Sequence, residues 1–202
     1  MYAGCKAAPG CKFMASSTDW SLRPLLDKKR RPNSMSPPQD PKHAPTGNEL
    51  TELAGRLVAE QTTMTLATAR KDVAWAAPVY YVFFKSGFYF LSDPQSRHIQ
   101  EALQSGQAAS AIHAAASTWQ EIRGLQMTGG IESVEMGLEA LGALKEYLKK
   151  YPFTREFFGQ NAPLDMRSFS QRFGVKLYKF VPARVYYLDN RIRFAFKETV
   201  TL

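Results

Sequence analysis

The feature that most constrains this fold is a change of hydrophobic period at Thr62. Over residues 50–58 the apolar side chains recur at helical spacing, which indicates one short amphipathic helix. Over residues 64–68 they occupy alternate positions, as in a strand with one buried face. Only a short polar turn at residues 70–72 separates this strand from a second apolar run at residues 73–84. A turn that short joins antiparallel neighbours, so the sequence predicts an antiparallel sheet that follows a helix.

The rest of the chain continues this pattern of strands with few helices. A turn at residues 85–87 leads into the aromatic strand 88–91, and the periodicity of residues 136–150 indicates a helix that ends before Pro152. The other expected strands lie at residues 108–115, 119–134, 175–188 with a bend at Pro182, and 193–196. Strands and long helices do not alternate strictly, and Gly-x-Gly-x-x-Gly and Walker motifs are missing, which argues against a wound nucleotide-binding sheet. We therefore expect a mainly β fold, a small barrel with three flanking helices.

Most of the positive charge lies before the region with strand patterns. The formal net charge is +8, but residues 1–48 hold eight Lys and Arg against three Asp, together with seven of the twelve prolines. We therefore expect a disordered, basic, proline-rich tail at residues 1–47 and one folded domain at residues 48–202, with Asn48 capping its first helix. The folded part holds eighteen Lys and Arg against fifteen Asp and Glu, a balance that does not indicate nucleic-acid binding. The basic run at residues 28–31 leaves a nucleic-acid or targeting role of the tail open.

Cysteine and histidine patterns argue against a metal site. Cys5 and Cys11 both lie in the tail, without a second cysteine pair, and neither His43 nor His113 has partners at ligand spacing. No apolar run approaches the length that spans a membrane. We expect no metal, no membrane segment and a cytoplasmic location.

The strongest candidate for a binding site is the segment after the aromatic strand 88–91. Asp93 is suited to cap a helix and Pro94 to occupy its first position, which places the next residues where backbone N–H groups lack helical partners. The side chains expected to converge at this helix start are Ser92, Ser96, Arg97 and His98. Hydroxyl, guanidinium and imidazole groups at a helix N-terminus predict a phosphate site. The alternative is a capped surface helix whose Arg97 faces solvent.

Two motifs in this order of elements carry a resemblance to a known family. They are Ser92-x-x-x-Ser96-Arg97 and Ile122-Arg123-Gly124-Leu125-Gln126-x-x-Gly129. Over residues 49–188 the chain resembles the pyridoxamine-phosphate oxidase-like FMN-binding split-barrel family, and within it the YhbP-like bacterial branch. The resemblance implies a six-stranded antiparallel split barrel that forms a homodimer and holds one FMN at each subunit interface.

The resemblance also implies which residues contact the flavin. In pyridoxamine-phosphate oxidases a Thr-x-x-x-Ser-Arg-Lys segment holds the flavin phosphate, and the matching residues here are Ser92, Ser96, Arg97 and His98. His98 replaces the family's Lys, so it keeps a hydrogen-bond donor whose charge depends on pH. The ring contacts implied are Val79, Tyr80 and Tyr81, with Trp119 and Gln126 toward the flavin or the partner subunit.

Each of these assignments has a purely structural alternative. Tyr80 and Tyr81 could be ordinary barrel or interface aromatics, and Trp119 could cover a hydrophobic edge. Arg123 could pair with a carboxylate on a neighbouring stretch, Glu121 or Glu132.

The function that the resemblance implies is an FMN-dependent oxidoreductase. It would take reducing equivalents from a nicotinamide donor and pass them to an unknown acceptor, with no catalytic side chain assigned. The alternative is a non-enzymatic module that binds or senses flavin or haem, and some related proteins use deazaflavin. The Arg-x-His segment with which pyridoxamine-phosphate oxidases hold their substrate is missing from residues 189–196, so vitamin B6 oxidation is not expected.

Overall fold

The structure, a computed structural model, describes residues 45–154 and 173–202. The expected tail at residues 1–47 therefore lies almost wholly outside the described residues. The helices are α1 (Gly47–Glu60), α2 (Arg97–Ser105) and α3 (Leu138–Lys150), with short 3-10 helices η1 (Trp119–Glu121) and η2 (Pro152–Thr154). The strands are β1 (Thr63–Arg70), β2 (Val73–Tyr80), β3 (Val82–Phe84), β4 (Gly87–Ser92), β5 (Ala108–His113), β6 (Arg123–Ser133), β7 (Lys176–Asp189) and β8 (Lys197–Thr199).

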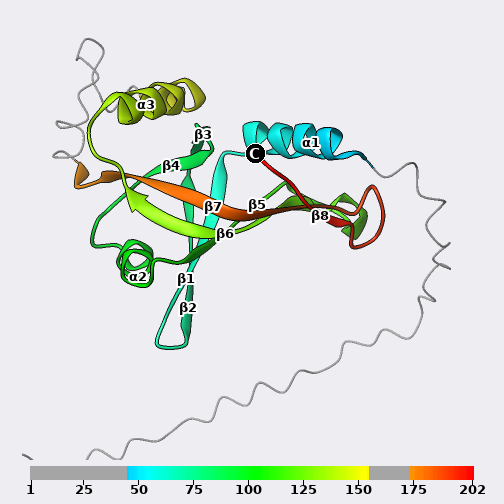
Figure 1. Cartoon of the computed structure of the whole chain (residues 1–202), viewed down its shortest axis with the longest axis horizontal. Helices are drawn as coiled ribbons and strands as arrows, with labels where there is room; N and C mark the ends of the chain where they lie inside the picture. Colours follow the sequence, from blue (N-terminus) through cyan, green and yellow to red (C-terminus); the bar gives the residue numbers. More distant parts are fainter. Residues whose placement is uncertain (1–44, 155–172) are drawn as a thin grey trace, which may run out of the picture. The chain divides into compact units, whose positions relative to one another are not determined.

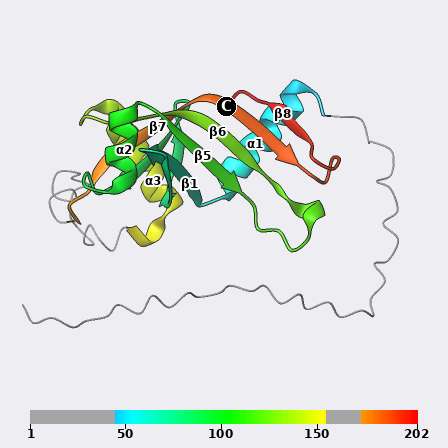
Figure 2. The same cartoon turned by 90° about the horizontal axis from the view of Figure 1, so that it is seen from below.

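All eight of these strands belong to one antiparallel sheet. Its order is β2-β1-β5-β6-β7-β4-β3, and β8 pairs with β7 beside this path. The two end strands, β2 and β3, are consecutive in the chain and separated only by Tyr81. Because the chain joins the two ends of the sheet, the sheet has to curl back on itself, as Figures 1 and 2 show. The expected mainly β fold is confirmed, but the described residues form eight strands and not six.

One extra strand arises because the apolar run 73–84 is not continuous. It breaks at Tyr81, whose side chain is fully buried and donates from its hydroxyl to the Val58 carbonyl at 2.8 Å. The seam between β2 and β3 is bridged by the Tyr151 hydroxyl, which lies 2.6 Å from the Thr62 carbonyl oxygen and 2.5 Å from that of Tyr81. The same hydroxyl accepts the Tyr81 N–H at 3.3 Å. No turn residue marks this break. The chain changes from one end strand of the sheet to the other at Tyr81, so the break follows from closure of the sheet and not from a turn.

Other element boundaries also differ from the expected ones. The long strand begins at Arg123 because residues 119–121 form η1, and the last short strand is β8 and not residues 193–196. The first helix is capped by Thr46, not by Asn48. The Thr46 backbone N–H donates to the Glu49 carboxylate at 2.6 Å, which is half of a capping box.

The predicted bend at Pro182 is a β-bulge. The pairing of β6 with β7 shifts register between Thr128 and Gly129, and Gly129 is the residue opposite Pro182. A Cβ atom on Gly129 would overlap the Val181 carbonyl, so the close approach of the two backbones requires glycine here. Of the two explanations for the glycines in this strand, the bulge therefore accounts for Gly129.

The core divides according to the alternation of the strands. On β4, Phe88 and Phe90 point to the inner face, where α1 and α2 also contribute side chains, whereas Tyr89 points outward to α3. The outer contact is tightened by Glu139, which accepts hydrogen bonds from the hydroxyl of Tyr89 and from Lys179. In Figure 1, α1 and α3 lie above the sheet and α2 lies below it. In the strand order β2 is an end strand, and four residues lie between the end of β4 and the start of α2.

Candidate functional site

The segment between β4 and α2 forms a tight turn before the helix. Asp93 accepts the Gln95 N–H on its side chain at 2.7 Å and the Ser96 N–H on its carbonyl at 3.0 Å. The helix therefore begins at Arg97, with Ser96 in the N-cap position, and not at Pro94 with Asp93 as the cap. Asp93 accepts the N–H groups of the turn, as aspartate often does in turns. Ser96 and the first N–H groups of the helix therefore lie together at the start of α2.

Three of the four predicted phosphate ligands meet at this helix start. The Ser92 Oγ atom lies 2.9 Å from His98 Nε2 and 3.1 Å from Ser96 Oγ. Ser96 Oγ in turn lies 3.3 Å from His98 Nε2. We call these three residues the α2 cluster. Their polar atoms satisfy one another, and each also has the chemistry to donate to a phosphate oxygen.

The α2 cluster is a set of neutral groups near neutral pH. His98 is buried, and burial lowers the pKa of its imidazole below the ordinary value. The cluster's affinity for an anion therefore has to come from hydroxyl and imidazole donors and from the positive end of α2.

Arg97 points away from the α2 cluster. Its Nε donates to the Glu101 carboxylate at 2.7 Å, and its guanidinium stacks over the Trp75 ring at 4.7 Å from the ring centre. Glu101 is buried, and hydrogen bonds from Thr68, at 2.6 Å, and from Arg97 hold the pKa of this carboxyl below its usual value. Arg97 thus ties α2 to the β1–β2 hairpin, where it also reaches the Val73 carbonyl at 3.4 Å. The sequence analysis missed these partners, although Arg97 and Glu101 have the spacing of a helical ion pair.

The three residues expected along the flavin ring face different ways. Tyr81 is directed into the core, and Val79 is partly buried against the inner cluster. Tyr80 is 47% exposed, and its ring packs against Tyr151 at 5.2 Å and against Phe153 at 5.7 Å. On β2 the side chains that offer an exposed apolar surface are therefore Val73, Trp75 and Tyr80. Trp75 was not singled out from the sequence.

Trp119 and Gln126 lie on a different part of the sheet from the α2 cluster. α2 ends just before β5 and η1 follows β5, so the loop that carries Trp119 and the helix α2 lie at opposite ends of that strand (Figure 2). Trp119 packs edge-on against Phe194 at 5.5 Å, and Gln126 accepts from Lys197 at 2.7 Å. Within one chain these two residues are not brought to the α2 cluster.

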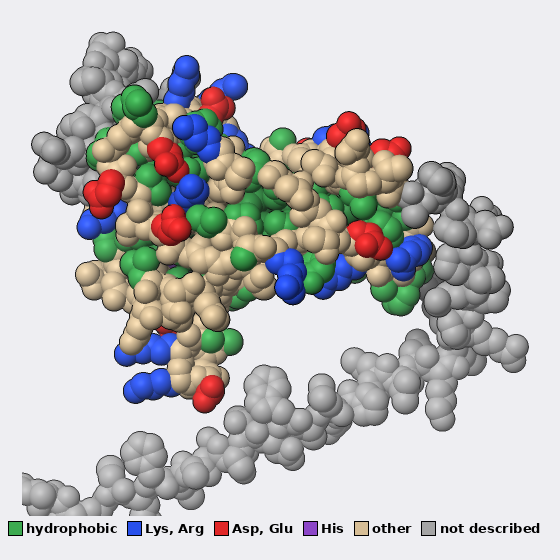
Figure 3. All heavy atoms as spheres, viewed as in Figure 1, with side chains coloured by type: hydrophobic (Ala, Val, Ile, Leu, Met, Phe, Trp, Pro, Cys, Tyr) green, Lys and Arg blue, Asp and Glu red, His purple; other side chains and the backbone are tan. Residues whose placement is uncertain are grey.

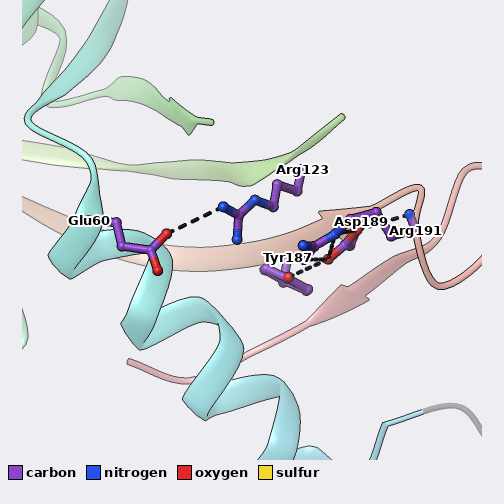
Figure 4. A network of polar contacts seen from close by, with 5 residues as sticks. All are labelled: Glu60, Arg123, Tyr187, Asp189 and Arg191. Atoms are coloured by element: carbon purple, nitrogen blue, oxygen red, sulfur yellow. Dashed lines mark hydrogen bonds and ion pairs between the residues drawn. The ribbon is translucent and has the colours of Figure 1, made fainter. Parts of the chain in front are cut away.

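Arg191, which follows β7, and Arg123, the first residue of β6, both form ion pairs (Figure 4). Arg191 binds the buried Asp189 through two nitrogens, at 2.9 Å and 2.6 Å, and Tyr187 donates to the same carboxylate at 2.7 Å. Arg123 pairs with Glu60 of α1 at 3.4 Å, not with Glu121 or Glu132. These contacts hold the end of β7 and connect β6 to α1, which is a structural role.

Over the face shown in Figure 3, Lys and Arg are interspersed with Asp and Glu and form no single basic patch. Within residues 45–154 and 173–202 no group of three His, Cys, Asp or Glu could hold a metal ion. None of the helices in this part of the chain is both long and apolar enough to cross a bilayer.

Comparison with curated proteins identifies relatives of this chain, although no family model matches it. A UPF0306 protein of Klebsiella pneumoniae is 31% identical over 103 residues, which are 50% of this chain and 69% of the relative. The UPF0306 protein YhbP of Salmonella arizonae is 31% identical over 102 residues, again 50% and 69% of the two chains. The chain belongs to the UPF0306 (YhbP) family. This confirms the branch that the sequence motifs indicated.

Solved structures share the fold at low sequence identity. A haem-binding protein of Mycobacterium smegmatis has a TM-score of 0.57 at 16% identity, covering 78% of this chain and 59% of its own. HutZ, the haem storage protein of Vibrio cholerae, has a TM-score of 0.54 at 15% identity, covering 67% and 92%. A putative pyridoxamine 5'-phosphate oxidase of Listeria innocua has a TM-score of 0.52 at 14% identity, covering 69% and 98%. At these identities the comparisons establish the fold, which is that of the split-barrel proteins, and not the ligand.

Proposed function

We propose that this protein binds FMN and holds the flavin phosphate at the α2 cluster. The observation that carries the proposal is the convergence of Ser92, Ser96 and His98 at the start of a nine-residue helix. A phosphate group accepts hydrogen bonds from hydroxyl, imidazole and backbone N–H donors, and all three kinds meet at this point. The family resemblance supports the same residues.

The donor set fits a phosphate without a rearrangement of the backbone. The three side chains already lie within 3.3 Å of one another, so a phosphate oxygen can replace the hydrogen bonds that they now make among themselves. Arg97, the residue between Ser96 and His98, is paired with Glu101 and points away from these three side chains. Its hydrogen bond to Glu101 positions it over Trp75, so it supports the site by holding the β1–β2 hairpin against the start of α2.

The exposed surface of β2 supports a place for the ring and for a second copy of the chain. β2 is an end strand of the sheet, its side chains are largely exposed, and Val73, Trp75 and Tyr80 add apolar area to it. Unpaired strand edges with exposed apolar side chains are sites of association. In the proposed homodimer the flavin ring lies along β2, and Trp119 and Gln126 approach it from the partner subunit.

The proposed activity is an oxidoreduction with a nicotinamide donor and an acceptor of unknown identity. Bound flavin would supply the redox chemistry, because its ring accepts and returns hydride equivalents. The chain's own residues would bind and orient it. The α2 cluster would fix the phosphate, and β2 would hold one face of the ring against solvent.

Haem binding is the second candidate, because two of the similar structures are described as a haem-binding and a haem storage protein. The histidines in the described residues are His98, which is buried in the α2 cluster, and His113, which is exposed at the end of β5. If His113 held a haem iron, the α2 cluster would remain free to bind FMN, because His113 does not belong to that cluster. The absorbance spectrum of the purified protein distinguishes a haem Soret band from the two bands of flavin.

The experiment that tests the proposal compares FMN with riboflavin, which lacks the phosphate. We expect the wild-type protein to bind FMN at least tenfold more tightly than riboflavin, and we expect the double variant Ser92→Ala, Ser96→Ala to lose that preference, since hydrogen bonds to charged groups contribute roughly 1.5 to 3 kcal/mol. Ser105→Ala, at the other end of α2, is the matched control and should keep it. Equal affinity of the wild-type protein for FMN and riboflavin would contradict the phosphate site. A nicotinamide-oxidation assay with the FMN-loaded protein then separates an enzyme from a carrier.

A further inference from the structure

A cavity of about 370 Å³ lies away from the α2 cluster, where α1, β3 and α3 meet. Figure 1 shows α1 and α3 with β3 between them. The lining residues are Gly55, Val58 and Ala59 from α1, Val82 and Phe83 from β3, and Glu146, Lys149 and Lys150 from α3. The volume is in the range of cavities that bind small organic ligands. No residue of the α2 cluster belongs to it.

Lys150, the last residue of α3, places an ammonium group at this cavity. Its Nζ donates to the Val58 carbonyl at 3.2 Å and lies over the Tyr81 ring, 4.0 Å from the ring centre. In the part of the chain that the structure describes, no carboxylate forms an ion pair with it. Burial lowers the pKa of Lys150 to about 8. At neutral pH the Lys150 side chain is therefore charged in most molecules of the protein.

The carboxylate that lines the cavity is paired with a lysine other than Lys150. Glu146 lines the cavity, but its side chain pairs with the exposed Lys149 at 3.6 Å. The cavity therefore carries a net charge of one positive unit, contributed by Lys150. Charges removed from water are normally paired, because an unpaired one keeps a desolvation penalty.

The walls beside this ammonium are apolar. Val82 is buried, Phe83 is partly buried, and Val58 closes the cavity from α1. A ligand that complements both features has one negative charge and an apolar body. A dianion such as a phosphate fits less well, because only one positive charge is available and Glu146 stands at the wall.

We propose that the cavity between α1, β3 and α3 binds a small monocarboxylate, whose carboxylate pairs with Lys150 and whose apolar body packs on Val82 and Phe83. The ligand supplies the counter-ion that Lys150 lacks among the described residues. This site is separate from the α2 cluster and does not depend on whether FMN binds there.

The test is a titration of the full-length protein with octanoate, and with 1-octanol as the probe that has the same chain but no charge. We expect saturable binding of octanoate, and at least tenfold weaker binding of octanol, since a charge-assisted contact contributes about that factor or more. Lys150→Met should weaken octanoate binding at least tenfold and leave octanol unchanged. Lys145→Met, which removes an exposed charge of α3 that does not line the cavity, should change octanoate binding less than twofold.

Two further measurements keep the result interpretable. Lys150→Arg keeps the charge, so it should bind octanoate within about fivefold of wild type, and all variants should unfold with similar cooperativity. In a protein with ¹³C-labelled lysines, the Lys150 signal should titrate near pH 8 without ligand, and at higher pH with octanoate bound. The proposal is overturned by equal binding of octanol and octanoate, by unchanged binding in Lys150→Met, or by no uptake of octanoate.

Discussion

The α2 cluster and the Lys150 cavity are suited to negatively charged groups in opposite ways. At the start of α2 the donors are neutral, they hydrogen-bond to one another, and the helix dipole adds the positive potential. At the end of α3 the donor is a charge, held over an aromatic ring beside apolar walls. The first arrangement is satisfied without a ligand, and its selectivity depends on geometry. The second carries a desolvation penalty that a counter-ion relieves, so its selectivity depends on charge.

The largest expected effect comes from placing a negative charge within the α2 cluster. Ser96→Asp keeps a good N-cap residue, so the free energy of unfolding should change by less than about 0.5 kcal/mol. Two negative charges about 4 Å apart near a protein surface repel by roughly 4 kcal/mol, so FMN affinity should fall at least a hundredfold. Fluorescence titration with FMN measures this, and Gln104→Glu, exposed on the same helix, is the control that should stay within twofold. Unchanged affinity in Ser96→Asp would remove the phosphate from this position.

A smaller effect, on the free energy of unfolding, is expected from removing the Tyr151 hydroxyl, which hydrogen-bonds at the break between β2 and β3. Tyr151→Phe removes the hydroxyl that lies between the Thr62 and Tyr81 carbonyls and leaves the Tyr81 N–H with its longer hydrogen bond to the Thr62 carbonyl, at 3.4 Å, which should lower the free energy of unfolding by about 1 to 3 kcal/mol. Tyr80→Phe, whose ring packs against the same residue, should cost less than about 0.5 kcal/mol, as surface changes usually do. Urea denaturation of the two variants gives the comparison, and equal losses would show that the hydroxyl is not what holds the seam.

The desolvation penalty of the Lys150 ammonium should appear in the pH dependence of stability. The pKa of Lys150 is about 8 in the folded chain against an ordinary 10.5, so between these values the unfolded chain binds more protons and stability rises with pH. Because the amine is only half buried, we expect a gain of about 1 to 2 kcal/mol between pH 7 and pH 9.5 in the wild type relative to Lys150→Met. Thermal or urea unfolding at the two pH values tests this. Parallel curves for the two proteins would mean that Lys150 is well solvated.

The smallest effect has the same sign as that of Lys150, a stability that falls as pH falls, but it lies in the pH range in which histidine titrates. Burial lowers the pKa of His98, so the unfolded chain binds the proton first as pH falls through the ordinary pKa of histidine. The wild type should therefore lose stability between pH 7 and pH 5, and His98→Asn should lose less over the same range. If the phosphate of bound FMN favours the imidazolium, FMN should protect the wild type against this loss, and a loss that FMN leaves unchanged would place the phosphate away from His98.

The sequence predicted what depends on neighbours along the chain. Ser92, Ser96 and His98 converge because a strand ends and a helix begins within a few residues, which the local pattern reveals. The direction of Arg97 was not predictable in full, because Trp75 and the Val73 carbonyl reach it only through the hairpin of β1 and β2. The contact of Arg97 with Glu101 was predictable, because Glu101 lies four residues after Arg97 in the same helix.

The features that the sequence did not predict depend on how the sheet closes. The break at Tyr81 has no turn residue, and its cause is the meeting of the two ends of the sheet. The cavity at Lys150 needs Val58 and Tyr81, which are distant in the sequence and are brought together by the same closure. Trp119 has the side chain of a strand former, but the loop turns there because Glu121 accepts the Ser117 N–H at 2.8 Å.

The seam between β2 and β3 has a consequence for local fluctuations. These two strands do not pair with each other, and Thr62 and Tyr81 are joined by the Tyr151 phenol oxygen and by one long backbone hydrogen bond, from the Tyr81 N–H to the Thr62 carbonyl at 3.4 Å. Opening this part of the molecule requires far fewer broken contacts than separating β6 from β7, which are paired along eleven positions. Amide protons of β3 should therefore exchange with deuterium through a low-energy opening, whereas those of β6 should exchange only when the whole domain unfolds.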